Sequence, residues 1–416
     1  MSTKKVVIVG AGIVGLSTAY YLNRRGIEVE VIDQTKGNDN CSFGNAGYVA
    51  PSHLVPLASP GIISQGLKWM LNSKSPFYIK PRADLDLFKW GWLFKKASTS
   101  KRVKAAVPIL YQLTTESQLL YEQIMQEENI EAGYEKSGLL MVCQTPKGLA
   151  HEMELLHLAK EYGLQAENLT KEETEKLEPQ IKYDMVGSLY FESDAWMTPH
   201  VFMRAFVALL RKKGVQFRYN TLVKDIKRQG QKIVHLNTSE GMITGDEFVI
   251  TAGAWTSLLM KKLGVSVPLQ GGKGYSFLMN PTHRPKLPSI LVEGRIATTP
   301  MLDGLRIAGT MELSGINHAI DQRRVEGIIE HLKQAIPQYE AYDFSSVQPW
   351  AGLRPCSPDG LPYIGKTHAA DNLIIGTGHA MLGWTLGPIT GQLITQNILN
   401  EKVSISSHLL AVDRYH

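Results

Sequence analysis

The sequence predicts an α/β fold of two domains, one of which is assembled from pieces that lie far apart in the chain. A short β-branched strand at residues 5–9 runs into a glycine-rich turn and a helix, and a second strand follows at 27–32. Similar strand–turn–helix units recur near 248–255 and 373–399. The residues between these units alternate strands with exposed helices, which indicates a second domain inserted into the first.

Length and composition exclude several classes of protein. A chain of 416 residues can form two domains with good cores. A net charge of +5 is too weak and too dispersed for a nucleic-acid partner, but it suits anionic ligands. The three cysteines form no CxxC pair, so we expect neither disulfides nor a cysteine metal site. With no secretory signal and no long apolar run, we expect a cytoplasmic protein.

The first unit carries the pattern of a dinucleotide site. Gly10 permits a tight turn, Gly12 lets the backbone approach a pyrophosphate, and Gly15 allows the helix to pack closely on the strand. Free N–H groups of the helix then face the phosphates. Asp33 ends the second strand, where a carboxylate accepts a hydrogen bond from a ribose hydroxyl and disfavours a 2′-phosphate. The motif does not distinguish FAD from NAD.

The remaining elements follow from turn residues and periodicity. Residues 36–61 are rich in Gly, Asn, Ser and Pro and predict a loop, whereas 62–125 predict helix. Strands are expected at 138–142, 187–191, 216–219, 233–237 and 248–250, and within 265–315; helices are expected at 146–162, 171–177, 199–213, 321–334 and 388–399. We therefore expect residues 1–60, 198–260 and 350–416 to form the nucleotide domain, and residues 61–197 and 261–349 to form the inserted domain.

Several remote segments resemble a known family. Residues 41–47, 59–61, 273–276, 350–365 and 378–385 are similar, in this order, to the D-amino acid dehydrogenase branch of the FAD-dependent amino acid oxidase superfamily. Glycine oxidase and sarcosine oxidase are more distant relatives. The resemblance covers nearly the whole chain. It implies a Rossmann-like FAD-binding domain, an inserted substrate domain with a mixed β-sheet, and dehydrogenation of a Cα–N bond.

The motif and the resemblance together predict the cofactor contacts. Residues 45–47 are expected along the flavin ring, and the turn at 378–383 is expected on its other side, where N–H groups stabilise the negative charge of reduced flavin. The predicted contacts are Gly10, Gly12, Ile13, Val14, Gly15, Asp33, Gln34, Ser42, Asn45, Ala46, Gly47, Val223, Gly253, Trp255, Gly378, His379, Met381, Leu382, Gly383 and Trp384. The alternative for His379 is a purely structural role.

Three residues are candidates for contact with the substrate, and a fourth, Lys273, is a weaker candidate for contact with an anion. A guanidinium binds a carboxylate through two parallel hydrogen bonds, and the arginine of a similar G-L-R-P element does this in related oxidases, so Arg354 is the predicted anchor. The alternative is that Arg354 has only a structural role, at the end of a strand. Tyr275 either offers its hydroxyl to the substrate or packs within the sheet. His53 either contacts the substrate or is a buried, hydrogen-bonded loop residue, and Lys273 either pairs with an anion or lies in solvent.

Other residues bear on the polarity of the substrate, on how the flavin is attached and on metal binding. Met381 stands where glycine oxidase carries an arginine, which favours a less polar substrate than glycine. Cys356 lies where some relatives attach flavin covalently, but the local pattern resembles the branch that binds FAD without a covalent bond. His151 and His157 are six residues apart and do not share a helix face, so no metal site is expected.

Tryptophans alternate with lysines in residues 62–96, a pattern that suits a bilayer interface. The alternative is a pair of amphipathic helices packed over the active site, and the two are compatible. The resemblance also implies electron transfer to the respiratory chain. We expect a cytoplasmic protein in which this stretch packs over the active site, and contact with the inner face of the cell membrane stays open.

The sequence predicts oxidative deamination of D-amino acids, including proline-like cyclic imino acids, with hydride transfer to FAD. A quinone or another electron-transfer partner is the expected acceptor. Three alternatives remain open: an oxidase that produces hydrogen peroxide, a non-catalytic FAD-binding subunit of a larger complex, and an NAD-dependent dehydrogenase.

Overall fold

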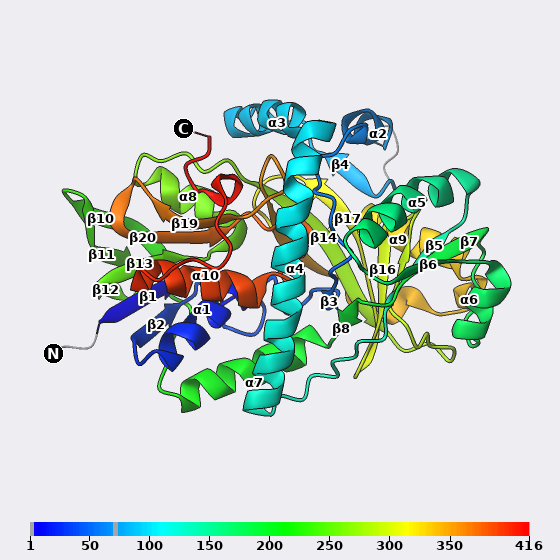
Figure 1. The fold of residues 1–416 in the computed structure, drawn as a ribbon, viewed down its shortest axis with the longest axis horizontal. Helices are drawn as coiled ribbons and strands as arrows, with labels where there is room; N and C mark the ends of the chain where they lie inside the picture. Colours follow the sequence, from blue (N-terminus) through cyan, green and yellow to red (C-terminus); the bar gives the residue numbers. More distant parts are fainter. Residues whose placement is uncertain (1–3, 70–73, 416) are drawn as a thin grey trace.

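The computed structural model describes residues 4–69 and 74–415, and it confirms the predicted α/β fold. Two large sheets lie side by side, and the long helix α4 (Ser100–Glu128) runs across the boundary between them (Figure 1). One sheet carries the glycine-rich turn. The other is a mixed sheet, as expected for the inserted part.

The first large sheet is mainly parallel. In spatial order its strands are β19 (Tyr363–Thr367), β20 (Ala370–Thr377), β13 (Glu247–Ile250), β1 (Lys5–Val9), β2 (Glu28–Ile32) and β9 (Gln216–Arg218). Only β19 is antiparallel to its neighbour. The turns after β1, β2, β13 and β20 therefore meet at one edge of the sheet, which is where open α/β sheets bind ligands.

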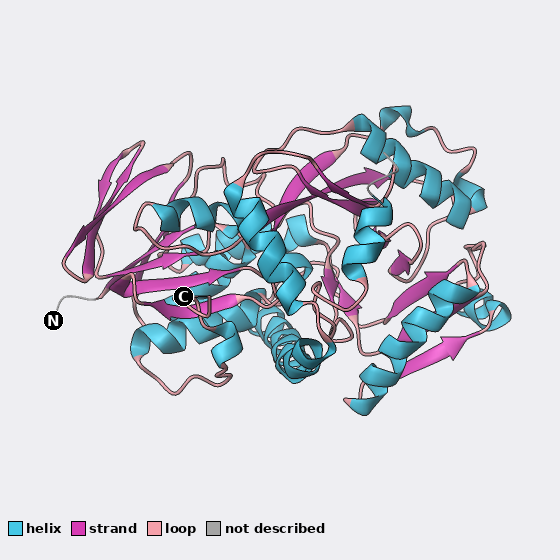
Figure 2. Ribbon diagram, turned by 90° about the horizontal axis from the view of Figure 1, so that it is seen from above, coloured by secondary structure: helices cyan, strands magenta, loops and turns pink. Residues whose placement is uncertain are grey.

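Helices cover one face of this sheet, and a small sheet covers the other. The helical face holds α1 (Ile13–Arg24), α7 (Pro199–Lys212) and α10 (Gly387–Leu399). The opposite face packs on α8 (Thr256–Lys261) and on an antiparallel sheet of β10 (Val223–Gln229), β11 (Lys232–Thr238) and β12 (Gly241–Ile243). Figure 2 shows this small sheet at the end of the molecule where the N-terminus lies.

The second large sheet is mixed. Its strands are β18 (Trp350–Cys356), β14 (Gln270–Met279), β17 (Gly304–Leu313), β16 (Ile296–Met301), β15 (Ser289–Leu291), β5 (Leu139–Cys143), β7 (Gly187–Phe191) and β6 (Ala166–Leu169), with β4 (Phe77–Ile79) beside β17. Helix α9 (Gln322–Ala335) packs on one face, and α5 (Pro146–Glu161) covers the other face over β5 and β7. Helix α6 (Lys171–Leu177) precedes β7.

The segment predicted as helix at 62–125 is more varied than expected. Helix α2 (Ile62–Trp69) is followed by the short strand β4 before α3 (Leu85–Ala97) and α4 begin. The aromatic and β-branched residues of β4 extend because they pair with β17, so a tertiary contact overrides the helical period. A two-stranded sheet of β3 (Tyr48–Val49) and β8 (Ala195–Trp196) ties the predicted loop to the strand region after β7.

The predicted division into two domains stays a prediction. Strand β18, which that division places with the nucleotide domain, pairs with β14 in the mixed sheet. Helix α4, which the division places in the inserted domain, packs on α10 and adds Leu113, Tyr121 and Ile124 to the core around α1.

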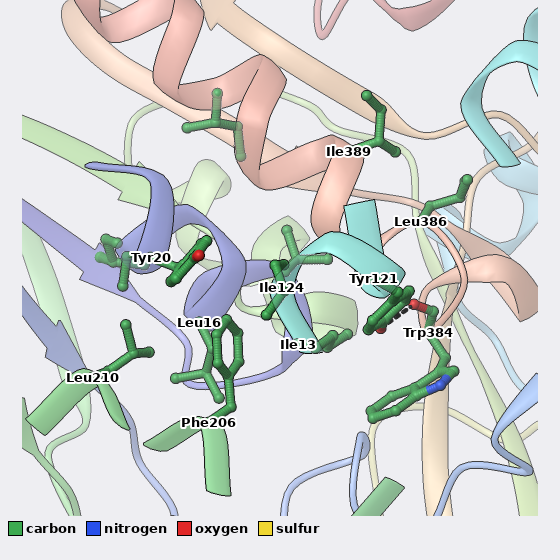
Figure 3. Close-up of a cluster of buried hydrophobic side chains, with 14 of the residues drawn as sticks. Ile13, Leu16, Tyr20, Tyr121, Ile124, Phe206, Leu210, Trp384, Leu386 and Ile389 are labelled. Atoms are coloured by element: carbon green, nitrogen blue, oxygen red, sulfur yellow. Dashed lines mark hydrogen bonds between the residues drawn. The ribbon is translucent and has the colours of Figure 1, made fainter. Parts of the chain in front are cut away.

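Tyr121 joins α4 to the C-terminal turn. Its fully buried hydroxyl donates a 2.7 Å hydrogen bond to the carbonyl oxygen of Trp384 (Figure 3). The Tyr121 ring also packs edge-on against Phe202 of α7. The turn at 380–384 is therefore held in place by a helix that lies more than 250 residues earlier in the chain.

We predict that Tyr121→Phe lowers the free energy of unfolding by ~0.5–1.5 kcal/mol, because the carbonyl oxygen of Trp384 loses one of its two donors and keeps only the 3.2 Å hydrogen bond from the N–H of Gly387. Urea unfolding followed by circular dichroism measures this change. Tyr111→Phe is the matched control, since no hydrogen bond of the Tyr111 hydroxyl occurs among the described residues. Equal effects of the two substitutions would contradict the role assigned to the Tyr121 hydroxyl.

Candidate active site

A cavity of about 1750 Å³ begins at the turns of the six-stranded sheet and continues across one face of the mixed sheet. Most of the predicted site residues line it: Gly10, Gly12, Ile13, Val14, Asp33, Gln34, Ser42, Asn45, Ala46, His53, Val223, Gly253, Trp255, Tyr275, Arg354, His379, Met381, Leu382, Gly383 and Trp384. Gly15, Gly47 and Gly378 lie outside the lining. The structure therefore brings together segments from both ends and the middle of the chain.

In the glycine-rich turn, two glycines allow close backbone packing and a third faces the cavity. Gly10 has φ +114°, and a Cβ there would lie 2.5 Å from the carbonyl oxygen of Thr251. A Cβ at Gly15 would lie 1.9 Å from the carbonyl oxygen of Gly10, so Gly15 serves the helix–strand contact. Gly12 faces the cavity. The first turn of helix α1 holds no acidic residue, and only the N–H of Ile13 is bound by a side chain, that of Ser42, so the positive end of the helix attracts an anion.

Asp33 is held by the backbone around it. One carboxylate oxygen accepts from the N–H of Ala11 at 2.6 Å, and the other accepts from the N–H of Thr35 at 2.8 Å. Asn40, which the sequence did not single out, donates to the carbonyl oxygen of Ala11 at 2.9 Å. Ser42 accepts from the N–H of Ile13 at 3.0 Å. Each Asp33 oxygen keeps a second lone pair, so the carboxylate can still accept from a ribose hydroxyl.

The loop at 41–47 is fastened to the mixed sheet. Ser276 donates to the carbonyl oxygen of Gly44 at 3.0 Å, and Thr299 donates to that of Ala46 at 2.7 Å. A Cβ at Gly44 would lie 2.2 Å from the Trp350 ring, so only glycine fits there. The mixed sheet holds residues 44–46, and the glycine-rich turn holds Asn40 and Ser42, so the loop is fixed on two sides along the cavity wall.

Arg354 lies flat against strand β14. A Cβ at Gly274 would lie 2.1 Å from its Nη1, so the guanidinium rests directly on the glycine backbone. Nη1 donates at 2.9 Å to the carbonyl oxygen of Thr310. Thr310 has φ +67°, an uncommon conformation for a β-branched residue, at a bulge between β14 and β17.

Arg354 has no acidic partner within ion-pair distance among the described residues. Burial lowers its pKa from the usual value, but an arginine remains charged at neutral pH. A cation in the wall of a large cavity, with one hydrogen bond to a carbonyl oxygen, is available for an anionic ligand.

Tyr275 and Lys273 point to the opposite face of the sheet. Side chains alternate along a strand, and Tyr275 packs in the core under α9. Its hydroxyl donates to Glu312 at 2.6 Å, and burial raises its pKa. Lys273 Nζ lies 3.2 Å from the same carboxylate and donates to Asn317 at 2.9 Å. This geometry favours the packing alternative for Tyr275, and Lys273 is buried rather than in solvent.

His53 belongs to a polar chain that the sequence did not reveal. Its Nδ1 lies 3.3 Å from the hydroxyl of Ser52, which donates to Asp194 at 2.5 Å. Burial lowers the pKa of His53 to about 4 and raises the pKa of Asp194 to about 7. His53 is therefore uncharged at neutral pH. No sequence signal links Ser52 with Asp194, because they meet only through the pairing of β3 with β8.

The C-terminal turn closes the cavity before α10 begins. Gly378 has φ +82°, and a Cβ there would lie 2.7 Å from the Tyr363 ring. His379 is buried, its Nε2 lies 2.9 Å from the hydroxyl of Thr390, and burial lowers its pKa to about 3. This favours a structural role for His379. Met381 is 49% exposed and lines the cavity.

Cys356, two residues after Arg354, is shielded from solvent and has low reactivity. Cys356 is fully buried, and its sulfur would lie 2.8 Å from a Cβ at Gly272. Burial raises the pKa of its thiol to about 11, which makes it a poor nucleophile at neutral pH. No group of residues suited to a metal ion occurs in the described part of the chain.

Comparisons with known proteins agree with this geometry. The model of the family described as FAD dependent oxidoreductase matches residues 5–397. The chain belongs to this family of FAD-dependent oxidoreductases. It is 32% identical, over 96% of both chains, to a D-amino acid dehydrogenase of Vibrio vulnificus (strain CMCP6). It is also 32% identical, over 99% of both chains, to one of Granulibacter bethesdensis.

Solved structures of low sequence identity share the fold. Glycine oxidase from Geobacillus kaustophilus superposes with a TM-score of 0.80 at 20% identity and covers 100% of both chains. L-proline dehydrogenase from P. horikoshii has a TM-score of 0.76 at 16% identity, with 99% of this chain and 98% of that chain covered. Among the helices described, none combines the length and hydrophobicity needed to cross a bilayer.

The residues of the cavity fit the FAD that the family uses. The start of α1, whose first turn holds no acidic residue, suits a pyrophosphate, and Asp33 suits the ribose. Gly44, Asn45 and Ala46 and the turn at 380–384 line the same cavity as Arg354 of β18. A dinucleotide and a small anionic substrate therefore both find complementary groups in one cavity.

Proposed function

We propose that the protein oxidises D-amino acids, including proline-like imino acids, with FAD bound without a covalent bond, and passes the electrons to a quinone or another acceptor. The observation that carries this proposal is Arg354, a cation without an acidic partner among the described residues, placed in the wall of the FAD-family cavity. The D-amino acid dehydrogenases to which the chain is 32% identical support the choice of substrate.

Arg354 would fix the carboxylate of the substrate. Its Nη1 already donates to Thr310, and Gly274 supports the plane of the guanidinium from beneath. The remaining N–H groups can form two parallel hydrogen bonds with a carboxylate, which sets orientation as well as charge. A fixed carboxylate places the Cα–H of the substrate reproducibly, and such positioning accounts for much of the rate in this type of reaction.

FAD, when bound, supplies the hydride acceptor at N5. The first turn of α1 would hold its pyrophosphate and Asp33 its ribose, while residues 45–47 and 380–384 would contact its ring. The substrate amine must lose a proton before the hydride leaves, because an ammonium group has no lone pair to form the imine. His53 is uncharged at neutral pH, so it adds no positive charge that would oppose the substrate's conversion to an imine.

We expect anaerobic addition of D-amino acids to bleach the bound yellow flavin, because hydride transfer removes its visible absorbance. A panel of D- and L-amino acids, glycine, sarcosine and hydroxyproline isomers, followed by absorbance spectroscopy, measures this. Bleaching by L-isomers alone would contradict the proposed stereochemistry. A flavin that no amino acid reduces would support a non-catalytic subunit, and steady oxygen uptake without an added acceptor would support an oxidase.

Gly274→Ala should weaken substrate binding by about tenfold or more while FAD stays bound, because the added Cβ displaces a guanidinium worth ~1.5–3 kcal/mol in charged hydrogen bonds. Titration of the flavin spectrum with a substrate analogue measures the affinity. Gly271→Ala on the same strand is the matched control, since the nearest atom to its new Cβ lies 3.5 Å away.

Arg354→Lys should show the same loss as Gly274→Ala, because lysine lacks the bidentate fork. Unchanged affinity in both variants would remove Arg354 from the site.

We also propose that helix α3 rests on an anionic membrane surface. Its inner side packs Trp90 into the core, where the indole donates to the carbonyl oxygen of Cys356 at 2.9 Å. Its outer side exposes Leu85, Phe88 and Trp92 by 87%, 67% and 55%. A helix that is apolar on both sides is unusual for a water-facing surface. Of the predicted stretch 62–96, residues 70–73 lie outside the described residues.

Basic residues surround this outer side. No aspartate or glutamate occurs between residues 87 and 115, and all the lysines and arginines there are exposed: Lys89, Lys95, Lys96, Lys101, Arg102 and Lys104. Lys96 Nζ lies 3.5 Å above the ring of Trp92. Apolar side chains flanked by cations are complementary to an anionic lipid surface.

The protein should sediment with phosphatidylglycerol vesicles and much less with neutral phosphatidylcholine vesicles. Replacing both Phe88 and Trp92 with aspartate should reduce binding by about tenfold or more, because each large apolar side chain contributes ~1.5–3 kcal/mol when buried. Met242→Asp, at a 64% exposed methionine on β12, is the control. Equal binding to both lipids, or no effect of the double substitution, would overturn this proposal.

A further inference from the structure

Three side chains from adjacent strands of the mixed sheet hold the loop at 43–46 by its carbonyl oxygens. Two of them, Ser276 of β14 and Thr299 of β16, are neutral hydroxyls. The third is Arg306 of β17, which lies between these strands and pairs directly with Thr299. Its Nη1 donates to the carbonyl oxygen of Phe43 at 3.3 Å. A cation therefore lies beneath a loop that lines the cavity.

Arg306 is a costly residue for this position. It is only 6% exposed, its Nε has no hydrogen-bond partner, and no carboxylate lies within ion-pair distance of it in the described part of the chain. Burial lowers its pKa to about 10, so the guanidinium still carries its charge at neutral pH. Burying a charge without an ionic partner is unfavourable. A serine or threonine would hold the loop without this cost, so the charge requires a separate explanation.

A histidine connects Arg306 to a carboxylate at the surface. Arg306 Nη2 lies 3.4 Å from Nδ1 of His200, and Nε2 of His200 lies 2.9 Å from exposed Asp303. An arginine can only donate, so Nδ1 of His200 accepts and Nε2 carries the proton that it shares with Asp303. Asp303 thus balances part of the guanidinium charge, but only from the far side of an uncharged imidazole.

The hydrogen bond from Arg306 also orients a backbone donor. In a trans peptide the C=O and N–H bonds point in opposite directions. The carbonyl of Phe43 points down to Arg306, so the N–H of Gly44 in the same peptide points away from the mixed sheet. This N–H makes no hydrogen bond within the described part of the chain, and Gly44 lines the cavity. The peptide is therefore a dipole with its positive end toward the cavity.

We propose that Arg306 is a positioning residue for the bound flavin, which holds the Gly44 N–H toward the cofactor and favours the reduced flavin through its positive charge. The inference rests on the proposed function, in which FAD takes up a hydride. A hydride brings two electrons and one proton, so a neutral flavin that accepts it gains one negative charge. A fixed cation and an oriented N–H group stabilise such a charge, because they need no rearrangement when it forms.

Arg306→Gln should lower the reduction potential of the bound flavin by ~30 mV or more, which is a tenfold change in the ratio of reduced to oxidised flavin. Reductive titration of the FAD-loaded protein against a reference dye, without any amino acid, measures this potential. Arg306→Lys keeps the charge and should retain most of the potential. Arg204→Gln is the matched control, because Arg204 is exposed on α7, one turn after His200, and its charge is screened by water.

Asp303→Asn should shift the potential in the opposite direction. Without this carboxylate the guanidinium charge is less balanced, so the potential should rise. Asp303 is exposed, which keeps the test valid if Arg306→Gln impairs folding. Asp225→Asn, at a carboxylate of similar exposure on β10, is its control.

Two results would overturn the proposal. If the potential is unchanged in Arg306→Gln or in Asp303→Asn, Arg306 only holds the loop. If Arg306→Lys lowers the potential as much as Arg306→Gln, its charge does not favour the reduced flavin. Since the titration uses no amino acid, a flavin that amino acids fail to bleach would reject the proposed function and leave this test unaffected.

Discussion

The pairing of β14 with β18 is the constraint on which the site depends. In this antiparallel register Gly272 lies opposite Arg354 and Gly274 opposite Gly352, so glycines on β14 leave space for the guanidinium. The same alternation sends Tyr275 and Lys273 to the other face, under α9. A shift by one residue would exchange the two sets and bury the arginine in the core. The register thus decides which cation faces the cavity.

The environment of Arg354 shows how a buried cation stays available. A guanidinium without any partner would be too costly to bury, and one paired with a carboxylate would not bind an anion well. The structure uses an intermediate solution, in which the carbonyl oxygen of Thr310 accepts one hydrogen bond. That carbonyl is oriented by a bulge with a positive φ at Thr310, so local backbone strain supports the position of the Arg354 guanidinium.

Much of the fold could be predicted from the sequence because its signals are local. The glycine-rich turn, Asp33 and the strand–turn–helix unit at the C-terminal end each depend on neighbouring residues, and all of them line one cavity except the glycines that serve packing. Other features could not be predicted. Strand β4 exists through pairing with β17, and the chain from His53 through Ser52 to Asp194 joins segments separated by more than a hundred residues.

Local patterning in this chain therefore specified the α/β class, the family and the phosphate-binding turn, since each rests on residues adjacent in sequence. Strand order and register specified the rest. They set Arg354 against Gly274 and turned the Tyr275 side chain to the sheet face that packs against α9. The register between neighbouring strands decides which side chains share one face of the sheet. The paired residues are often far apart in the chain, so they meet only when the chain folds.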